Sequence, residues 1–273
     1  MVARRIQIEH LDGELVGEVH YLNASRRGGT EVARLPIVRG EVGRLGDELD
    51  AIIACSDLQG MTRGRGGPAE LLGVEVAAVL EELAFDGVLP PAARTGVILA
   101  GDLYSVPDAN KRGGFGSVAD VWRAFAERFA WVAGVAGNHD DVAGVAELGE
   151  RVHLLDGDVV EVDGLRIGGV GGIIGSKPKP GRRTEDAQLA LIEQAIDASL
   201  DVLVLHEGPD GADEHQRGNS AIRSLIEAGG VGLTVCGHDH WPAPLAALEH
   251  GQVLNVDTRV VVLVGRPVVG RPG

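Results

Sequence analysis

Hydrophobic and polar positions along the chain alternate between two patterns. Short apolar runs end in glycine or in a polar residue, which is typical of buried strands. Between them lie longer stretches in which apolar residues recur every three or four positions, as on one face of a helix. We predict strands at residues 51–55, 95–101, 130–137, 165–174, 200–206 and 231–237, and helices at 68–84, 117–129, 183–196 and 219–229. This alternation predicts an α/β protein.

Each predicted helix contains, near its beginning, a residue type that commonly starts helices. These residues are Pro68, Ser117, Thr184 and Asn219. After the last of these strands and helices, apolar residues predict three closing strands, with a turn at Gly251 between the first two. The closing strands fall within residues 244–250, 252–257 and 259–265.

Residues 1–48 carry a different pattern from the rest of the chain. Two stretches rich in β-forming residues flank Asp12-Gly13, a dipeptide that favours the turn of a β-hairpin. We therefore predict that residues 1–48 form a β-rich N-terminal extension with its turn at Asp12-Gly13. Residues 49–273 then form one α/β domain, because a chain of this length suits one large domain with an appendage.

Composition and charge narrow the classes of function. The chain has 25 Lys and Arg against 40 Asp and Glu, and the resulting net charge of -15 repels a phosphate backbone. We therefore expect no non-specific binding of nucleic acid. A small phosphorylated ligand remains compatible with this charge, because a bound metal ion reverses the local sign.

The sequence shows no signal for export or membrane insertion. Its first residues turn polar at once, and no run of about 18 apolar residues occurs. Two cysteines, Cys55 and Cys236, argue against a disulfide framework and fit a reducing compartment. We therefore expect a soluble, cytoplasmic protein with no membrane partner. Nothing in the sequence indicates its oligomeric state.

Polar side chains with metal-binding chemistry follow five of the predicted strands. Ligands of open α/β sheets bind at the carboxyl ends of strands, so these residues are candidates for a functional site. They are Asp57, Asp102, Asn138, His139, Asp140, His206, His238 and His240. Carboxylate, amide and imidazole groups together suit divalent first-row metals and make a poor set for thiolate-selective ones.

The segments differ in how strongly each indicates a site. A Gly-Asp pair alone is commonly a turn, and a single histidine such as His206 is commonly a structural residue. Gly-Asn-His-Asp at 137–140 is more specific, because three consecutive polar side chains after a buried strand need partners. Gly-His-Asp-His at 237–240 is the most specific, since two imidazoles so close together usually share a purpose.

The order of these segments resembles the calcineurin-like metallophosphoesterase superfamily. Its pattern is Asp-x-His, Gly-Asp, Gly-Asn-His followed by Asp or Glu, a single His, and Gly-His-x-His, each at a strand end. The matching segments here are "SDLQG" at 56–60, "GD" at 101–102, "GNHD" at 137–140, His206 and "GHDH" at 237–240. The resemblance covers about residues 49–265. It implies a four-layer α/β/β/α sandwich of two mixed β-sheets flanked by helices, with the N-terminal β-rich extension at an edge.

The resemblance also implies a site for two divalent metal ions. The implied ligands are Asp102 as the bridge, with Asp57, Gln59 and His240 for the first ion and Asn138, His206 and His238 for the second. Two such ions would clamp a phosphoryl oxygen and lower the pKa of a bound water. His139 resembles a histidine that is not a ligand and lies near the leaving oxygen, and Asp140 would orient or charge it.

Gln59 stands where the superfamily pattern has histidine. Amide and neutral imidazole are both uncharged, but an amide oxygen is a weaker and harder donor. Gln59 therefore binds the first metal through its oxygen, holds a metal-bound water, or leaves the first site partly occupied. A direct oxygen ligand favours Mn, with Fe, Zn, Ni and Mg as alternatives. In the reading without a metal role, Gln59 faces away and Asp57 only caps the next segment.

The resemblance implies a metal-dependent hydrolase of phosphomonoesters or phosphodiesters, acting on a small phosphorylated substrate or a phosphoprotein. One alternative is a non-catalytic protein-binding module on the same fold, and Gln59 is its only support. Another is metal-dependent hydrolysis of an amide or a carboxylic ester. The extension at residues 1–48 would cover a sheet edge, extend the substrate cleft or form an oligomer contact.

Two loops concentrate basic residues against the acidic background of the chain. They contain Lys111, Arg112, Lys177, Lys179, Arg182 and Arg183. Basic loops of this kind steer phosphate ligands, or they are solvated loops with no role in binding. The sequence leaves both interpretations open.

Overall fold

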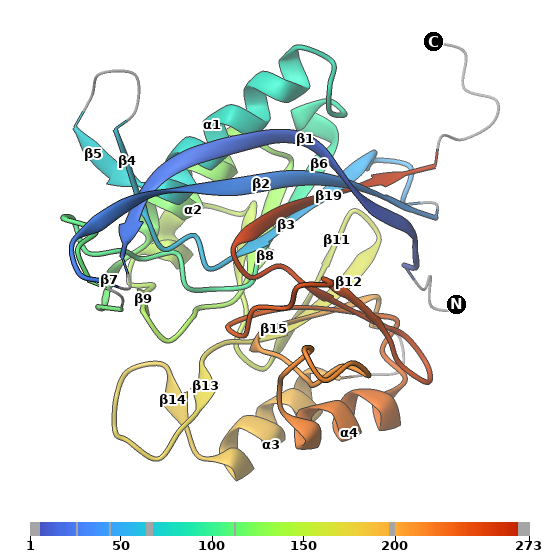
Figure 1. Cartoon of the computed structure of the whole chain (residues 1–273). Coiled ribbons are helices and arrows are strands. Elements are labelled where there is room, and N and C mark those ends of the chain that lie inside the picture. Colours follow the sequence, from blue (N-terminus) through green and yellow to red (C-terminus); the bar gives the residue numbers. More distant parts are fainter. Residues whose placement is uncertain are drawn as a thin grey trace.

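The computed structural model describes residues 6–25, 27–43, 45–63, 68–111, 113–196 and 200–266. Two mixed β-sheets dominate it, and helices flank them (Figure 1). The predicted α/β class, with two mixed sheets flanked by helices, is therefore confirmed. All six strands predicted for the alternating part of the chain are present, most of them slightly shorter than predicted.

The larger sheet has nine strands within the described residues, in the order β10-β8-β6-β3-β19-β2-β1-β4-β5. Strands β3, β6, β8 and β10 run parallel, and β19 pairs antiparallel with β3. The bounds are β1 (Ile8–Ala24), β2 (Thr30–Val42), β3 (Ala51–Ser56), β4 (Met61–Arg63), β5 (Ala69–Leu71), β6 (Thr95–Leu99), β8 (Trp131–Gly134), β10 (Val152–Leu154) and β19 (Arg259–Gly265).

The smaller sheet has six strands in the part of the chain that the structure describes, in the order β11-β12-β15-β16-β18-β17. Its four central strands run parallel, and both outer strands are antiparallel to their neighbours. The bounds are β11 (Asp158–Val162), β12 (Leu165–Val170), β15 (Val202–Glu207), β16 (Leu233–Gly237), β17 (Leu245–Ala247) and β18 (Gln252–Asn255). Two short parallel pairs are separate, namely β7 (Gly116–Ser117) with β9 (Asp140–Asp141) and β13 (Ile173–Ile174) with β14 (Arg182–Arg183).

The four α-helices of the described residues match the predicted helices, but only two begin as predicted. They are α1 (Leu72–Phe85), α2 (Ala119–Arg128), α3 (Glu185–Ala195) and α4 (Ser220–Gly229), with short 3-10 helices at Ala92–Arg94 and Val145–Leu148. Thr184 and Asn219 cap α3 and α4 by accepting backbone N–H groups. Pro68 does not start α1, because β5 intervenes, and Ser117 lies in β7. None of these helices is long and apolar enough to cross a membrane.

The N-terminal strands form a long hairpin, but its turn is not at Asp12-Gly13. Strand β1 runs through this dipeptide and ends at Ala24, and the turn closes where the N–H of Gly28 donates to the carbonyl of Ser25. The pairing with β2 shifts register between His10 and Glu14. Gly13 has a φ of 74°, so its conformational freedom is used in a strand irregularity instead of a turn. The apolar alternation that continues past Gly13 keeps the strand intact.

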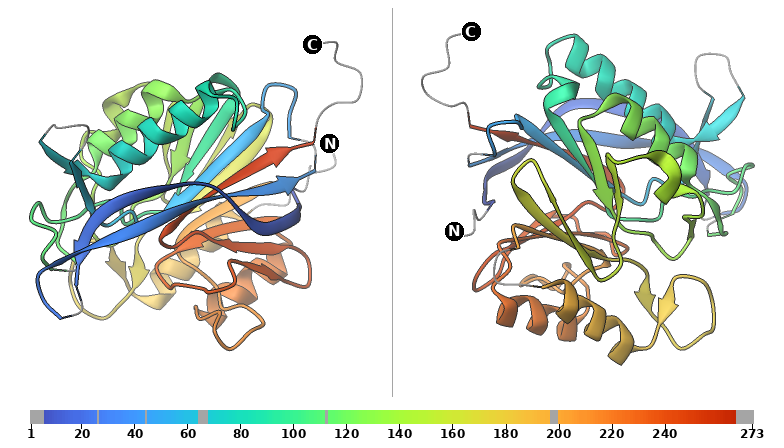
Figure 2. Two further views of the ribbon diagram at one scale, coloured as in Figure 1. Left: turned by 45° about the horizontal axis from the view of Figure 1, so that its top comes forward. Right: turned by 180° about the vertical axis from the view of Figure 1, so that it is seen from behind.

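Three hydrophobic cores join the layers. Side chains of β3 alternate, so that Ile53 and Cys55 pack toward α1 and α2 while Ile52 and Ala54 pack between the sheets. A third core lies between the smaller sheet and helices α3 and α4, and it contains Ile192, Leu203 and Ile226. The views in Figure 2 agree with this order, with α1 and α2 outside one sheet and α3 and α4 outside the other.

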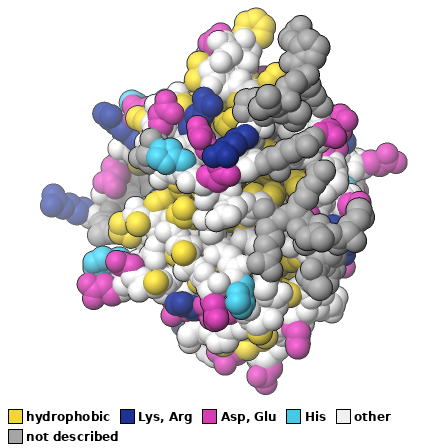
Figure 3. Space-filling model, turned by 90° about the vertical axis from the view of Figure 1, so that its right-hand side faces the viewer, with side chains coloured by type: hydrophobic (Ala, Val, Ile, Leu, Met, Phe, Trp, Pro, Cys, Tyr) yellow, Lys and Arg dark blue, Asp and Glu magenta, His cyan; other side chains and the backbone are white. Residues whose placement is uncertain are grey.

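The arrangement of strands brings distant segments to one place. Strands β3, β6 and β8 run parallel in the larger sheet, and β15 and β16 run parallel in the smaller one. Their carboxyl ends therefore fall at one edge of each sheet, and the loops that follow carry the polar motifs. On the face shown in Figure 3, acidic and basic side chains are interspersed with apolar ones.

Candidate metal centre

Segments that are far apart in the sequence meet at Asp102, which follows β6. Nε2 of Gln59 donates to Oδ2 of Asp102 at 2.7 Å. Nε2 of His206 lies 3.4 Å from Oδ1 of Asp102, and the backbone N–H of His139 donates to the same oxygen at 3.0 Å. The ring of His238 lies 5.1 Å from that of His206, centre to centre. One carboxylate is therefore surrounded by residues from four other strand ends.

The backbone at three of these strand ends adopts an unusual conformation. Asp57, Asp102 and His238 have φ values of 54°, 54° and 68°. Residues other than glycine rarely occupy this left-handed region, and such strain is concentrated at functional sites, where the surrounding structure enforces it. The conformation ends each strand abruptly.

Glycines in the motifs permit the close approach of these loops. A methyl group at Gly137 would overlap Oδ1 and the backbone nitrogen of Asp102. A methyl group at Gly237 would overlap the hydroxyl of Ser56 and approach Oδ2 of Asp57. The glycines of the "GNHD" and "GHDH" segments are thus required by packing against the carboxylates.

Three side chains form a cluster with the chemistry of a metal site. Ligand atoms of Asp102, His206 and His238 all lie within 4.8 Å of one another. Nε2 of His206 and Oδ1 of Asn138 are buried, and neither has a hydrogen-bond partner within the described residues. Nδ1 of His206 donates to the carbonyl of Ala100 at 2.8 Å, which leaves Nε2 for another partner. Buried polar atoms normally have partners, so each of these two atoms is suited to bind a divalent cation.

The other predicted ligands line an adjoining cavity of about 450 Å³. It is lined by Asn23, Asp57, Gln59, His238, His240, Asp257 and Thr258. Oδ2 of Asp57 is held by the hydroxyl of Ser56 at 2.7 Å and by the backbone N–H of His238 at 2.9 Å. Gln59 faces this site, so the reading in which it faces away is wrong. Asp57 therefore connects the "SDLQG" segment with the "GHDH" segment and does not merely cap its own segment.

Comparison with known proteins bears directly on this arrangement. Residues 51–242, more than half of the chain, match the family model described as calcineurin-like phosphoesterase. The chain therefore belongs to the calcineurin-like phosphoesterase family. The matched segment contains every residue predicted as a metal ligand or catalytic group. It leaves out β1 and β2 at one end and β17, β18 and β19 at the other.

Solved structures show the fold of this family member but not its activity. The crystal structure of TT1561 of Thermus thermophilus has a TM-score of 0.57 at 16% identity, covering 76% of this chain and 88% of that one. A protein of unknown function from Aquifex aeolicus, AQ665, has 13% identity and covers 78% of this chain and 95% of that one. Its TM-score is 0.35, too low to support a comparison. No curated protein matches this chain.

The electrostatics of the phosphoesterase site favour bound cations. Asp57, Asp102, Asp140 and Asp257 are all buried. Burial, and then the charge of Asp257, raises the pKa of Asp57. Burial and the charge of Asp102 raise the pKa of Asp140 to about 6. Burial opposes charge on His206, yet Asp102 and Asp57 raise its pKa to about 10. His206 and His139 lower the pKa of Asp102 against the effect of burial. A cation at the site would likewise favour the charged form of the carboxyls whose pKa is raised.

His139 is held beside the cluster by the backbone. Its Nδ1 donates to the carbonyl of Gly114 at 2.6 Å, and its Nε2 lies 3.9 Å from Oδ2 of Asp102. A methyl group at Gly113 would lie 3.1 Å from Cε1 of His139, so this loop packs closely against the ring. The geometry fixes which nitrogen faces the carboxylate.

Asp140 does not hold His139, contrary to the sequence-based expectation. Its Oδ1 accepts the backbone N–H of Leu103 at 2.8 Å and of Tyr104 at 3.1 Å, and its Oδ2 accepts that of Gly137 at 2.8 Å. No hydrogen bond joins it to His139 among the described residues. The carboxylate instead ties the loop after β6 to the loop after β8, because three backbone donors satisfy it fully.

Asp257 is a site residue that the sequence analysis missed. Its Oδ1 accepts from Nδ1 of His240 at 3.0 Å and from the hydroxyl of Thr258 at 2.8 Å. Its side chain is nearly buried, and it lines the cavity that Asp57 also lines. The available signal was the same as for Asp57, a carboxylate directly after an apolar strand.

The structure shows a role for only some residues of the two basic loops. Arg183 pairs with Asp156 and donates to the carbonyl of Gly171, so its role is structural. Asn219, at the start of α4, is a helix cap. Arg112 lies outside the described residues. Neither Lys111 nor Lys177 lines the cavity at the metal cluster.

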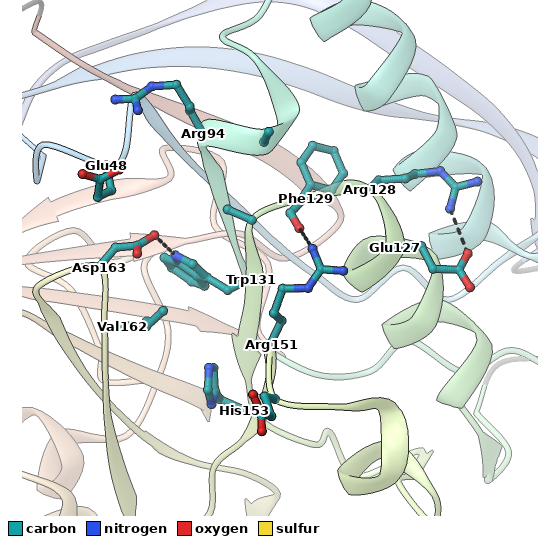
Figure 4. A pocket seen from close by; sticks show the side chains of 13 residues that line it. Glu48, Arg94, Glu127, Arg128, Phe129, Trp131, Arg151, His153, Val162 and Asp163 are labelled. Atoms are coloured by element: carbon teal, nitrogen blue, oxygen red, sulfur yellow. Dashed lines mark hydrogen bonds and ion pairs between the residues drawn. The ribbon is translucent and has the colours of Figure 1, made fainter.

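A separate cavity of about 620 Å³ lies at the opposite end of the strands, beside Trp131 at the start of β8 (Figure 4). Nε1 of Trp131 donates to Asp163 at 2.9 Å, and Nε of Arg94 pairs with Asp50 at 2.6 Å. Trp131 and Arg94 are therefore already paired, Arg94 with a residue outside the cavity lining. The cavity shares no residue with the metal cluster.

Proposed function

We propose that this phosphoesterase-family protein hydrolyses phosphate esters, monoesters or diesters, with two divalent ions in its site. The observation that supports this most directly is the cluster of ligand atoms of Asp102, His206 and His238 within 4.8 Å of one another, together with the buried Oδ1 of Asn138, which has no hydrogen-bond partner among the described residues. A purely structural role for these residues would leave Oδ1 of Asn138 buried without a hydrogen bond.

The residues divide into two ligand sets that share Asp102. The second ion would be held by Asp102, Asn138, His206 and His238, and the first by Asp102, Asp57, Gln59 and His240. Bound there, divalent cations supply Lewis acidity that polarises a phosphoryl oxygen and lowers the pKa of water. An amide oxygen from Gln59 favours a hard ion, so we propose Mn for the first position.

The protein's own groups position the reaction. His139 presents Nε2 on the side of Asp102, because its Nδ1 is committed to the carbonyl of Gly114. In its protonated form Nε2 donates the proton that the leaving alkoxide needs. Asp140 keeps the two loops that carry Asp102 and His139 in register through its three backbone hydrogen bonds. The substrate proposed is a small phosphorylated molecule.

The test is hydrolysis of phenyl phosphate and of bis(4-nitrophenyl) phosphate in the presence of Mn, Mg, Zn or Ni. Asp102→Ala and His139→Ala should each lower the rate by about a hundredfold or more. His250→Ala, at an exposed histidine, is the matched control and should change little. Unchanged rates in both site variants would overturn the proposal. Hydrolysis of a carboxylic ester but of neither phosphate ester would favour the ester-hydrolase alternative.

A non-catalytic binding module remains the second candidate, and Gln59 is the observation that favours it. A binding module would retain the fold but show no metal-dependent turnover with any phosphate ester. The hydrolysis test above separates the two. If the protein is a binding module, metal titration of Gln59→His should in addition show metal binding that the natural chain lacks.

A further inference from the structure

A second cavity, of about 570 Å³, adjoins the cavity at the metal cluster. His240 and Thr258 line both of them. The remaining lining residues of the second cavity are Leu11, Gly13, Tyr21, Arg34, Pro36, Val38, Pro242, Pro244 and Arg259. The two cavities share two lining residues and therefore lie side by side, with the metal cluster next to the first of them.

One wall of this second cavity comes from the N-terminal hairpin of β1 and β2. These strands precede the segment that matches the family model, which begins at residue 51. Asn23, at the end of β1, also lines the cavity at the metal cluster. Its Oδ1 accepts the N–H of Ala24 at 2.7 Å, so its amide N–H groups remain to meet a ligand. The extension thus contributes to the walls of both cavities.

The hairpin is anchored at two points beside the site. Strand β1 pairs with β4 through Leu22 and Met61, and Met61 lies two residues after Gln59 in the sequence. Gly60 packs so closely on the ring of Tyr21 that a methyl group there would overlap it. On the other side, β2 pairs with β19, which begins at Arg259 directly after the cavity residue Thr258. The position of this wall is therefore fixed relative to the ligands on both sides.

The chemistry of the second cavity differs from that of the first. More than half of its surface is apolar, and its lining includes leucine, valine, proline and tyrosine residues, whereas the first cavity is lined mainly by carboxylates, imidazoles and amides. Its size falls within the range of small-molecule sites, which are commonly apolar with few polar groups. Arg259 is nearly buried and donates from Nη2 to the carbonyl of Trp241, so it is a fixed part of the wall.

We propose that this second cavity binds the alcohol portion of the substrate, and that the substrate is a phosphate ester of a bulky, largely apolar alcohol. This inference rests on the proposed phosphoester hydrolysis. The phosphoryl group lies at the metal cluster, and the apolar part lies between β2 and the loop that contains Pro242 and Pro244. The N-terminal hairpin is then the element that sets substrate specificity.

The experiment compares kcat/KM for phenyl phosphate and 4-biphenylyl phosphate, whose leaving phenols are similar in acidity. Wild-type protein should prefer the larger ester. Val38→Phe, which fills the cavity, should lower kcat/KM for the biphenylyl ester by about tenfold or more and leave that for phenyl phosphate within about twofold. Val32→Phe is the matched control, because Val32 lies on the same strand, is 69% exposed and lines neither cavity.

A second variant tests the same cavity independently, so that the inference stays testable if Val38→Phe does not fold. Pro242→Phe approaches the cavity from the opposite wall at an exposed position and should produce the same selective loss. Hydrolysis of both esters with no preference, or equal losses for both esters in the folded variants, would overturn the inference while leaving phosphoester hydrolysis intact. Absence of hydrolysis of either ester by the wild-type protein would remove the proposed function and this inference with it.

Discussion

The amide of Gln59 contacts the carboxylate of Asp102, with Nε2 and Oδ2 2.7 Å apart. Glutamine therefore occupies the place in the site that the family pattern gives to histidine, and it does so next to the carboxylate at the centre of the cluster. Its Oε1 accepts no hydrogen bond from the described residues. Its amide now directs Nε2 toward Asp102, so a role as an oxygen ligand requires the amide to rotate.

Replacement of Gln59 should change metal preference more than fold. In Gln59→His, an imidazole nitrogen replaces a harder amide oxygen, so affinity for Zn relative to Mn should rise by about tenfold or more. Isothermal titration with each metal measures the ratio. Gln194→His, the same substitution on exposed α3, should leave it unchanged. An unaltered ratio in Gln59→His would show that residue 59 does not contact the ion.

Asp257 should strengthen metal binding through His240. Its carboxylate accepts from Nδ1 and so orients the ring, while Nε2 lies 3.4 Å from Nη2 of Arg259, which a bound ion would displace. Loss of such orienting partners commonly lowers metal affinity by about 10–100-fold. We expect this loss in Asp257→Ala, measured by competition with a metal chelator. Asp239→Ala removes an equal charge from the neighbouring exposed side chain and should lower affinity only slightly. Equal losses in the two variants would mean that Asp257 acts through charge alone.

Gly137 should tolerate no side chain. A methyl group there would overlap Asp102, so Gly137→Ala should displace the central carboxylate and lower the free energy of unfolding by about 1–3 kcal/mol. Urea unfolding and metal affinity measure the two effects. At Gly43 the nearest atom to an added methyl group is 3.6 Å away, so Gly43→Ala is the control. Metal affinity in Gly137→Ala equal to wild type would contradict the packing described here.

Both cysteines should be unreactive in the folded protein. Burial raises the pKa of Cys55 and of Cys236 to about 12, so at pH 8 both are thiols and not the nucleophilic thiolates. Iodoacetamide labelling followed by mass spectrometry should detect modification only after denaturant is added. Labelling of the native protein at the rate of a free thiol would place at least one cysteine at the surface.

The strands could be predicted from the sequence, and the motifs located in it, because both depend on local pattern. Ile53 and Ile98 lie in continuous apolar runs of buried parallel strands, and a carboxylate directly after such a run has few local roles. The motif at 237–240 was recognisable without any knowledge of its partners. Asp57, Gln59 and His240 line one cavity. This agrees with the grouping that the order of the motifs along the chain implied.

Other features depend on contacts between distant segments of the chain, which local sequence pattern does not reveal. Gly13 carries a turn dipeptide, yet the pairing of β1 with β2 extends past it. Asp140 was expected to contact its neighbour His139, but backbone donors from the loop after β6 satisfy it. Asp257 acquires its role only because β18 places it beside His240. The wall formed by β1 and β2 likewise follows from their pairing with β4 and β19.

The most direct test of a two-metal site is the number of metal ions bound by the folded protein. Native mass spectrometry of protein equilibrated with Mn should show about two ions for the wild type, as in two-metal hydrolases. Asp102→Ala should bind fewer, and Asn138→Ala should lose mainly the second ion, while His139→Ala should retain both. A wild-type protein that binds no divalent ion, or an Asp102→Ala variant that binds as many as the wild type, would contradict the metal centre proposed here.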